Sequence, residues 1–253
     1  MIEPHIHVLT LGAGKHVTQA AKAAILADLK ALRYIPDEVA ISVRSMSRAR
    51  ADVANMDTRF GKLVINKKFT TVDGDVGLPA RNPLAMLWVA MLESDRFSEY
   101  VISALLIHGP PSIDSPWSIV LYVDEVTCGN PLAVRDDARR KVQGVYWSLY
   151  QLGPVALADE SCWFEIAAFQ TSRTRTFDGG IPHLLDVCLS CFFDEQGHDL
   201  RHGAHFVFKG HGALMLSLRV EMLIGDIKAL CEAVGAMGVS GALPCFFCRR
   251  VLG

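Results

Sequence analysis

The 253-residue sequence predicts an α/β protein. Three strand-like runs follow one another closely between residues 117 and 170. A helical pattern, a fourth strand-like run and a second helical pattern come after them. The composition suits a folded chain, because 51% of the residues are hydrophobic and only 21% are charged. A core of mixed helices and strands is therefore expected, rather than a coiled coil or a disordered chain.

Charge and hydropathy exclude several classes of protein. The net charge is −2, without the bulk basic excess that is typical of a dedicated nucleic-acid binder. The most apolar window, residues 83–108, contains charged side chains that leave no run long enough to span a bilayer. The N-terminus has no basic segment followed by a cleavable apolar stretch, so secretion is not expected. The seven cysteines are an odd number and indicate reduced thiols rather than a disulfide framework.

Residues 1–75 are predicted to form an N-terminal helix and a basic linker region. Residues 18–33 are rich in strong helix formers, and Pro36 would end that helix. Residues 41–71 are polar and carry a local excess of five positive charges, with seven Lys and Arg against two Asp. A solvated linker is the favoured interpretation of this segment, and a phosphate-contacting segment is the alternative.

Residues 76–253 are predicted to carry the core, and they begin with a helix. Asn82 precedes Pro83, which suits an N-cap residue followed by the first helical position. The apolar residues 100–108 fit either a short helix or a buried strand, and Gly109 ends the segment.

Three strands are then expected in succession. Residues 117–126 form a continuous β-branched and aromatic run, as a central strand should. After a turn at 128–131, residues 141–152 alternate as a second strand, which Gly153 and Pro154 interrupt. Residues 162–170 form the third. Short connections predict an antiparallel meander.

A helix and a returning strand complete the expected core. Residues 181–193 place their apolar side chains on one helical face, residues 214–224 alternate as a strand, and residues 226–235 are helical with Asp226 as the cap. The strand at 214–224 returns through a helix, so it can lie parallel to the first strand. The expected order of elements is that of a partial ribonuclease H-like core: an antiparallel meander, a helix, a parallel strand and a second helix.

Two carboxylates occupy notable places in this scheme. Asp124 lies inside the apolar first strand, where an unpaired acid is costly, and Asp226 directly follows the returning strand. If these strands are neighbours, the two side chains come close together, and a divalent cation would relieve their repulsion. Such cations support phosphodiester cleavage. The simpler alternatives are an acid at a strand end for Asp124 and an N-cap for Asp226.

Cysteine and histidine spacing suggests further metal ligands. Cys245 and Cys248 have the spacing of half a tetrahedral zinc site. Cys188 and Cys191 could complete a four-cysteine set, but they belong to an amphipathic helix, so burial in the core is favoured. A histidine cluster in a Gly-rich segment that is expected to be a loop fits either a metal-hydrolase site or surface positions, and surface positions are favoured. The cluster comprises His198, His202, His205 and His211.

Together these motifs resemble DDE-type transposases of the CACTA and Plavaka kind. The similarity covers roughly residues 82–253 and includes Tyr122-Val-Asp124, the Gly129-Asn-Pro turn, Gly225-Asp226 and the Cys245/Cys248 pair. In that family the first catalytic aspartate lies in a Tyr-x-Asp strand, and the second follows a later strand. The resemblance implies that Asp124 and Asp226 are catalytic ligands of Mg²⁺ or Mn²⁺, that the partner is DNA, and that the protein is nuclear.

The sequence also departs from the family pattern. The third carboxylate and the remaining zinc ligands would follow Gly253, so the resemblance implies an incomplete, inactive transposase-derived core. A basic cluster near the second strand suggests phosphate contacts, although a solvated hairpin tip is the simpler interpretation. The cluster comprises Arg135, Arg139, Arg140 and Lys141.

Two rival hypotheses remain open. One is a non-enzymatic zinc-binding or interaction module, and the other is a chain without a stable fold, because an open sheet edge would be left where a further strand belongs.

Overall fold

A computed structural model describes residues 55–127, 141–174, 176–194, 199–208, 212–226 and 230–231, together with residues 30, 42, 44, 48 and 51–53. The helix predicted at 18–33 therefore lies outside the described residues, apart from Lys30. The turn predicted at 128–131 and most of the helix predicted at 226–235 also lie outside them.

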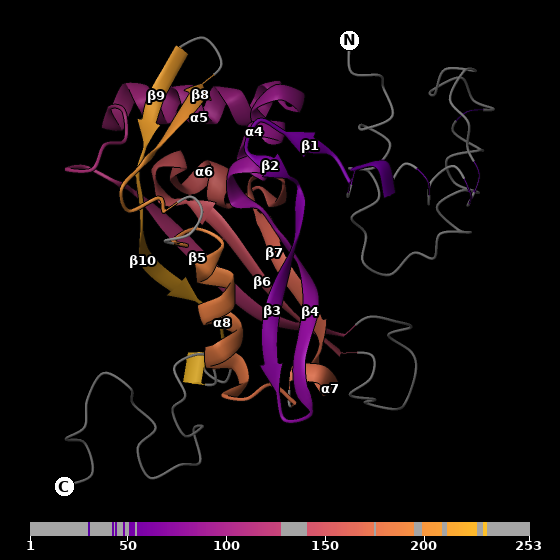
Figure 1. Cartoon of the computed structure of the whole chain (residues 1–253). Helices are drawn as coiled ribbons and strands as arrows, with labels where there is room; N and C mark the ends of the chain where they lie inside the picture. The colour runs from indigo at the N-terminus through magenta and orange to yellow at the C-terminus, as the bar shows by residue number, and fades with distance from the viewer. Residues whose placement is uncertain are drawn as a thin grey trace, which may run out of the picture.

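A mixed four-stranded sheet forms the centre of the molecule (Figure 1). Its strands are β5 (Trp117–Thr127), β6 (Lys141–Leu149), β7 (Phe164–Gln170) and β10 (Leu218–Ile224). They lie in the order β10-β5-β6-β7, with β5, β6 and β7 antiparallel and β10 parallel to β5. The predicted meander and the parallel returning strand are both confirmed.

The segment predicted as one strand at 214–224 is divided between two sheets. Residues Gly212–Leu216 form β9, which pairs with β8 (Ala204–Phe208) in a separate hairpin, and β10 begins only at Leu218. At the break between them, the carbonyl of Ser217 accepts a hydrogen bond from the amide of Trp117 at 2.9 Å. The prediction of a single strand was wrong because the alternating pattern continues across Ser217 while the pairing partner changes.

The connection between β6 and β7 is helical. β6 ends at Leu149, three residues before the predicted end, and β7 begins at Phe164. Between them lie two 3₁₀ turns and a short helix: η2 (Tyr150–Leu152), α6 (Gly153–Leu157) and η3 (Glu160–Cys162). Gly153 adopts a φ of 82°, which suits glycine, at the point where η2 ends and α6 begins.

Two capped helices precede the sheet. α4 (Pro83–Glu93) begins as predicted, because Oδ1 of Asn82 accepts hydrogen bonds from the amides of Leu84 and Ala85. α5 (Asp95–His108) contains the segment that fitted either a helix or a strand, and it is helical. Ser94 caps α5 by accepting a hydrogen bond from the amide of Phe97 at 3.1 Å.

The basic segment before α4 forms strands, so its interpretation as a linker was wrong from residue 57 onward. It contains β1 (Asp57–Thr58), β2 (Gly61–Lys62) and β3 (Val64–Thr71), and β3 pairs antiparallel with β4 (Gly74–Arg81). The predicted boundary between residues 75 and 76 falls inside this hairpin. Phe69 anchors the hairpin: its ring is fully buried, with centroids 5.2 Å from those of Phe169 and Phe177.

The remaining helices are α7 (Thr171–Thr174) and α8 (Gly180–Ser190). α8 lies against the sheet beside the β3–β4 hairpin (Figure 1), and its helical pattern was predicted. One hydrophobic cluster joins the sheet, the hairpins and the helices, with Trp147 and Phe192 among its fully buried side chains. Within the described part of the chain, no helix is both long and apolar enough to cross a membrane.

Candidate metal site

The candidate site lies where β5 and β10 run side by side in the same direction. Leu223 is paired with Leu121, and Ile224 is paired with Tyr122. Asp124 and Asp226 each follow the second pair by two residues, so continuing this register brings Asp226 level with Asp124. Two acids that are remote in sequence thereby reach the same end of the sheet.

Asp124 is partly buried and faces away from α8. Side chains alternate along a strand, so Tyr122 and Asp124 share the face opposite to Leu121 and Val123, which belong to the main core. The hydroxyl of Tyr122 donates a hydrogen bond to Oδ2 of Asp124 at 2.9 Å. Gly144 lies opposite Asp124 on β6, so no side chain comes from that position.

Aromatic rings hold Tyr122 in place. Its ring centroid lies 6.1 Å from that of Tyr146 on β6 and 6.0 Å from that of Trp163, which approaches edge-on. The space above Gly144 is filled by Tyr146, since a Cβ atom built on Gly144 would come within 2.5 Å of the Tyr146 ring. Sequence reasoning did not identify Gly144 or Tyr146 as parts of the site, because only the cross-strand register brings them beside Asp124.

Both acids act on the Tyr122 hydroxyl. Burial, followed by the hydrogen bond to Asp124, raises the pKa of Tyr122 to about 12. The negative charges of Asp124 and Asp226 contribute in the same direction. A single phenol therefore senses both carboxylates, as expected if they lie close together.

Asp226 stands at the transition from strand to helix. Its side chain is exposed, and its backbone carbonyl accepts a hydrogen bond from the amide of Leu230 at 2.9 Å. Leu230 and Cys231 are helical. The hydrogen bond thus joins Asp226 to the first of these two helical residues, while residues 227–229 lie outside the described residues.

The donor chemistry of this pair fits Mg²⁺ or Mn²⁺, which prefer carboxylate oxygens together with water or phosphate oxygens. Two carboxylates from adjacent strands are the usual protein contribution to such a centre, because these cations keep several non-protein ligands. In the described part of the chain, no group of three or more His, Cys, Asp or Glu side chains is arranged around one point. The candidate site is therefore considered as the two carboxylates of Asp124 and Asp226.

The other predicted ligands and contacts are mostly outside the described residues. This applies to Cys245, Cys248, Arg135, Arg139 and Arg140.

Lys141 is described, and it begins β6. Its Nζ lies 3.1 Å from Oε1 of Glu125, and Oε2 of the same carboxylate accepts a hydrogen bond from Thr171 at 2.9 Å. Glu125 therefore balances the charge of Lys141 within the fold.

Cys188 and Cys191 lie at the C-terminal end of α8, and Cys188 is buried in the core, as favoured from the sequence. Burial raises the pKa of the Cys188 thiol far above its usual range and that of Cys191 to about 11. Both thiols are therefore held in the protonated form, which is the weaker metal ligand.

Two of the four clustered histidines, His202 and His205, are described. His205 lies in β8, in a segment that was predicted to be a loop. His202 is exposed, and its Nε2 lies 3.8 Å from Oδ2 of Asp199.

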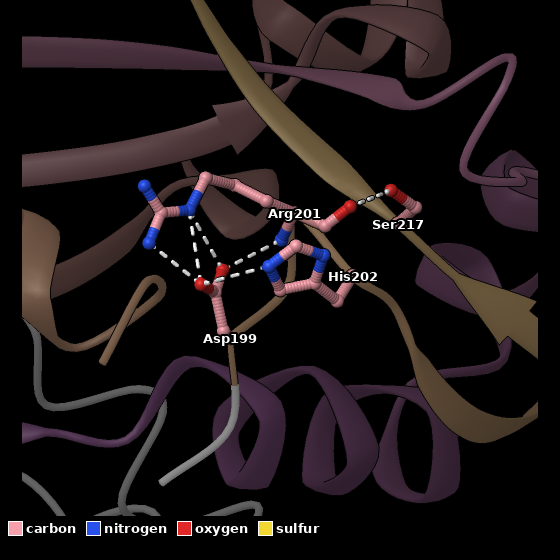
Figure 2. A network of polar contacts seen from close by, with 4 residues as sticks. All are labelled: Asp199, Arg201, His202 and Ser217. Carbon is pink, nitrogen blue, oxygen red and sulfur yellow. Dashed lines mark hydrogen bonds and ion pairs between the residues drawn. The ribbon is translucent and has the colours of Figure 1, made fainter. Parts of the chain in front are cut away.

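Figure 2 shows that the Asp199 carboxylate also accepts hydrogen bonds from Arg201, while Ser217 donates to the carbonyl of Arg201 at 3.2 Å. This network connects the turn at Asp199 with the break between β9 and β10, so its role is structural.

No protein-family model matches the chain, and comparison with curated proteins gives no significant match.

Proposed function

We propose that this protein has a partial ribonuclease H-like core and is a transposase-derived protein, related to metal-dependent DNA strand cleavage and transfer. One observation carries the proposal. β10 pairs in parallel with the first strand of an antiparallel meander, and the pairing ends at Ile224 and Tyr122, two residues before Asp226 and Asp124. The sequence resemblance to DDE-type transposases implies catalytic roles for the same two aspartates.

A divalent cation at this site would activate a water molecule and stabilise the leaving oxygen of a phosphodiester. The chain itself would contribute a partly buried carboxylate from Asp124 and an exposed one from Asp226. Tyr122 would orient the first of these through its hydrogen bond. The exposure of Asp226 leaves the site open on the side where a large substrate could approach.

DNA is the proposed partner and the nucleus the proposed location. Both proposals depend on the resemblance to transposases. The two carboxylates support only the binding of a cation through which DNA phosphates would be bound. Because the acids themselves repel phosphate, DNA should approach them only when cations neutralise their charge.

Fluorescence anisotropy with a labelled DNA duplex tests the proposal on the full chain. At constant ionic strength, Mg²⁺ should raise the affinity of the wild type for DNA severalfold, and Asp124→Asn should remove this increase. Asp186→Asn provides the matched control, because Asp186 is exposed on α8. A wild-type affinity indifferent to Mg²⁺, or the same Mg²⁺ response in Asp124→Asn, contradicts the proposal.

A further inference from the structure

The end of the β3–β4 hairpin is attached to the segment that joins α7 to α8 (Figure 1). The amide of Val72 donates a hydrogen bond to the carbonyl of Thr176, and the amide of Asp178 donates one to the carbonyl of Thr70, both at 3.0 Å. These two bonds flank a single antiparallel bridge outside the named strands. So short a connection depends strongly on whatever else holds the hairpin end in place.

His183, in the first turn of α8, supplies a third hydrogen bond at this place. Its Nε2 accepts from the amide of Thr70 at 3.3 Å. A backbone amide can only donate, so Nε2 must carry no proton, and the proton of the neutral imidazole lies on Nδ1. The hairpin end is therefore bonded to a titratable side chain, and the bond exists in only one of its two protonation states.

Neighbouring groups restrict the position of the His183 ring. The ring of Phe69, which is fully buried in the core, lies edge-on to it with the centroids 6.1 Å apart. The chain before the helix also passes closely, because a Cβ atom built on Gly179 would come within 3.2 Å of the Cβ atom of His183. The imidazole is therefore half-buried between the hairpin and the start of α8.

Protonation of His183 would remove this bond and replace attraction by repulsion. An imidazolium carries a proton on both nitrogens, so its Nε2–H would point at the N–H of Thr70. Histidine is the side chain that ordinarily changes its charge between pH about 5 and about 8. The bond is consequently complete at the upper end of this range and is lost as the pH falls through it.

The charged side chains on the elements around His183 do not reverse this effect. The two lysines of β3 are already paired, Lys67 with Asp194 at 3.1 Å and Lys68 with Asp75 at 2.5 Å. The other charged side chains that the structure describes in the hairpin turn, in α7, before α8 and in α8 are all exposed: Asp73, Arg173, Asp178 and Asp186. Water and salt therefore screen their interaction with an imidazolium.

We propose that His183 is a pH-sensitive switch for the end of the β3–β4 hairpin. A neutral imidazole holds residues 70–75 against residues 176–178. A protonated imidazole releases this end, while Phe69 keeps the rest of the hairpin in the core. The switch involves neither of the two aspartates of the candidate metal site, so it is independent of the proposed function.

Hydrogen exchange of the full chain tests the proposal, measured by NMR at pH about 7.5 and about 5.5 and corrected for the intrinsic exchange rate at each pH. We expect the protection factors of the Thr70, Val72 and Asp178 amides to fall together by about tenfold at the lower pH, which corresponds to the loss of one hydrogen bond. His183→Gln keeps an acceptor that does not titrate, so this fall should be absent. His108→Gln is the matched control and should show the wild-type fall, because His108 is an exposed histidine at the end of α5.

The pattern across the three amides is the decisive readout. Unchanged protection of the wild type at the lower pH overturns the proposal. A loss confined to Thr70 also overturns it, because the bond to His183 would then break without releasing the hairpin end. An equal loss in His183→Gln overturns it as well, since another group would then be responsible.

If His183→Gln fails to fold, the nitrogen chemical shifts of the His183 ring in the wild type decide the question. At pH about 7.5 we expect Nε2 to have the shift of an unprotonated nitrogen, and both ring nitrogens should reach imidazolium values over the pH range in which the three amides lose protection. The opposite tautomer, or titration of the ring without loss of protection, overturns the proposal.

Discussion

Ile224 of β10 is paired with Tyr122 of β5 across a parallel register. Because both strands run in the same direction, whatever follows each residue emerges at the same end of the sheet. Asp124 and Asp226 each follow this pair by two positions. The pairing of two hydrophobic strands therefore directs both acids of the candidate site to the same end of the sheet.

The close contact between Gly144 and Tyr146 should make Gly144 sensitive to substitution. In Gly144→Ala, the new Cβ would lie 2.5 Å from Cε2 and 2.6 Å from the hydroxyl oxygen of Tyr146, so the ring must move. We expect a loss of about 1–3 kcal/mol in the free energy of unfolding, measured by urea denaturation. Gly77 is also a strand residue, but a Cβ atom there would lie 3.5 Å from its nearest neighbour. The free energy of unfolding should therefore fall much less in Gly77→Ala. Equal losses in the two variants would contradict this description of the site.

Asn82 stabilises the start of α4 in two ways. Oδ1 caps the helix, and Nδ2 donates a hydrogen bond to the carbonyl of Phe60 at 2.7 Å. Asn82→Ala should therefore lower the free energy of unfolding by about 1–2 kcal/mol, whereas Asn82→Ser keeps a capping oxygen without placing a carboxylate against the Phe60 carbonyl and should lose less. Asn66→Ala, at an exposed position of β3, is the control. A lower stability of Asn82→Ser than of Asn82→Ala in thermal and urea unfolding would refute the capping role.

Asp199 should contribute to the acid sensitivity of the fold. Hydrogen bonds from the Arg201 side chain lower the pKa of Asp199 below its usual value of 3.8. A carboxylate with a lowered folded-state pKa stabilises the protein above its unfolded-state pKa, and this contribution is lost as the pH falls.

The free energy of unfolding of the wild type should therefore fall more steeply than that of Asp199→Asn as the pH decreases from about 5 to about 3. Asp114→Asn, at an exposed loop position, should retain the wild-type slope. Parallel slopes for the wild type and Asp199→Asn would show that the network in Figure 2 does not stabilise the ionised form.

The thiols of Cys188 and Cys191 should react only after unfolding. Burial holds both in the protonated form, and the pKa of Cys191 is raised to about 11. Iodoacetamide should therefore label them slowly in the native protein and rapidly in denaturant, as followed by peptide mass spectrometry. Addition of a zinc chelator to the native protein should not change the rate at which iodoacetamide labels these thiols. A faster labelling rate in the presence of the chelator would instead support a zinc site formed by four cysteines.

The sequence predicted the central sheet well because its strands have distinct patterns. Residues 117–126 form an unbroken apolar run, and the helical pattern before the last strand indicated a parallel return. The β3–β4 hairpin was not predicted because two adjacent lysines, Lys67 and Lys68, interrupt the alternation of apolar and polar residues before Phe69. Phe69 alone of these three is fully buried, and Lys67 is ion-paired with Asp194 at 3.1 Å.

The candidate site was only half predictable. Asp124 and Asp226 could be found from the sequence, since acids at the ends of apolar strands require an explanation. The contribution of Gly144 and Tyr146 depends on the register of β6 against β5, which no pattern within one strand specifies. The end of β9 at Leu216 could not be predicted either. The alternation of apolar and polar residues along a strand does not show which strand it pairs with.

A double-mutant cycle on Mn²⁺ affinity tests whether Asp124 and Asp226 bind one cation centre. Calorimetry would compare the wild type with Asp124→Asn, Asp226→Asn and the double variant. We expect each single substitution to weaken Mn²⁺ binding by more than about tenfold, and the double variant to lose little more affinity than either single variant. Unchanged binding in either single variant, or losses that multiply in the double variant as for independent sites, would contradict it.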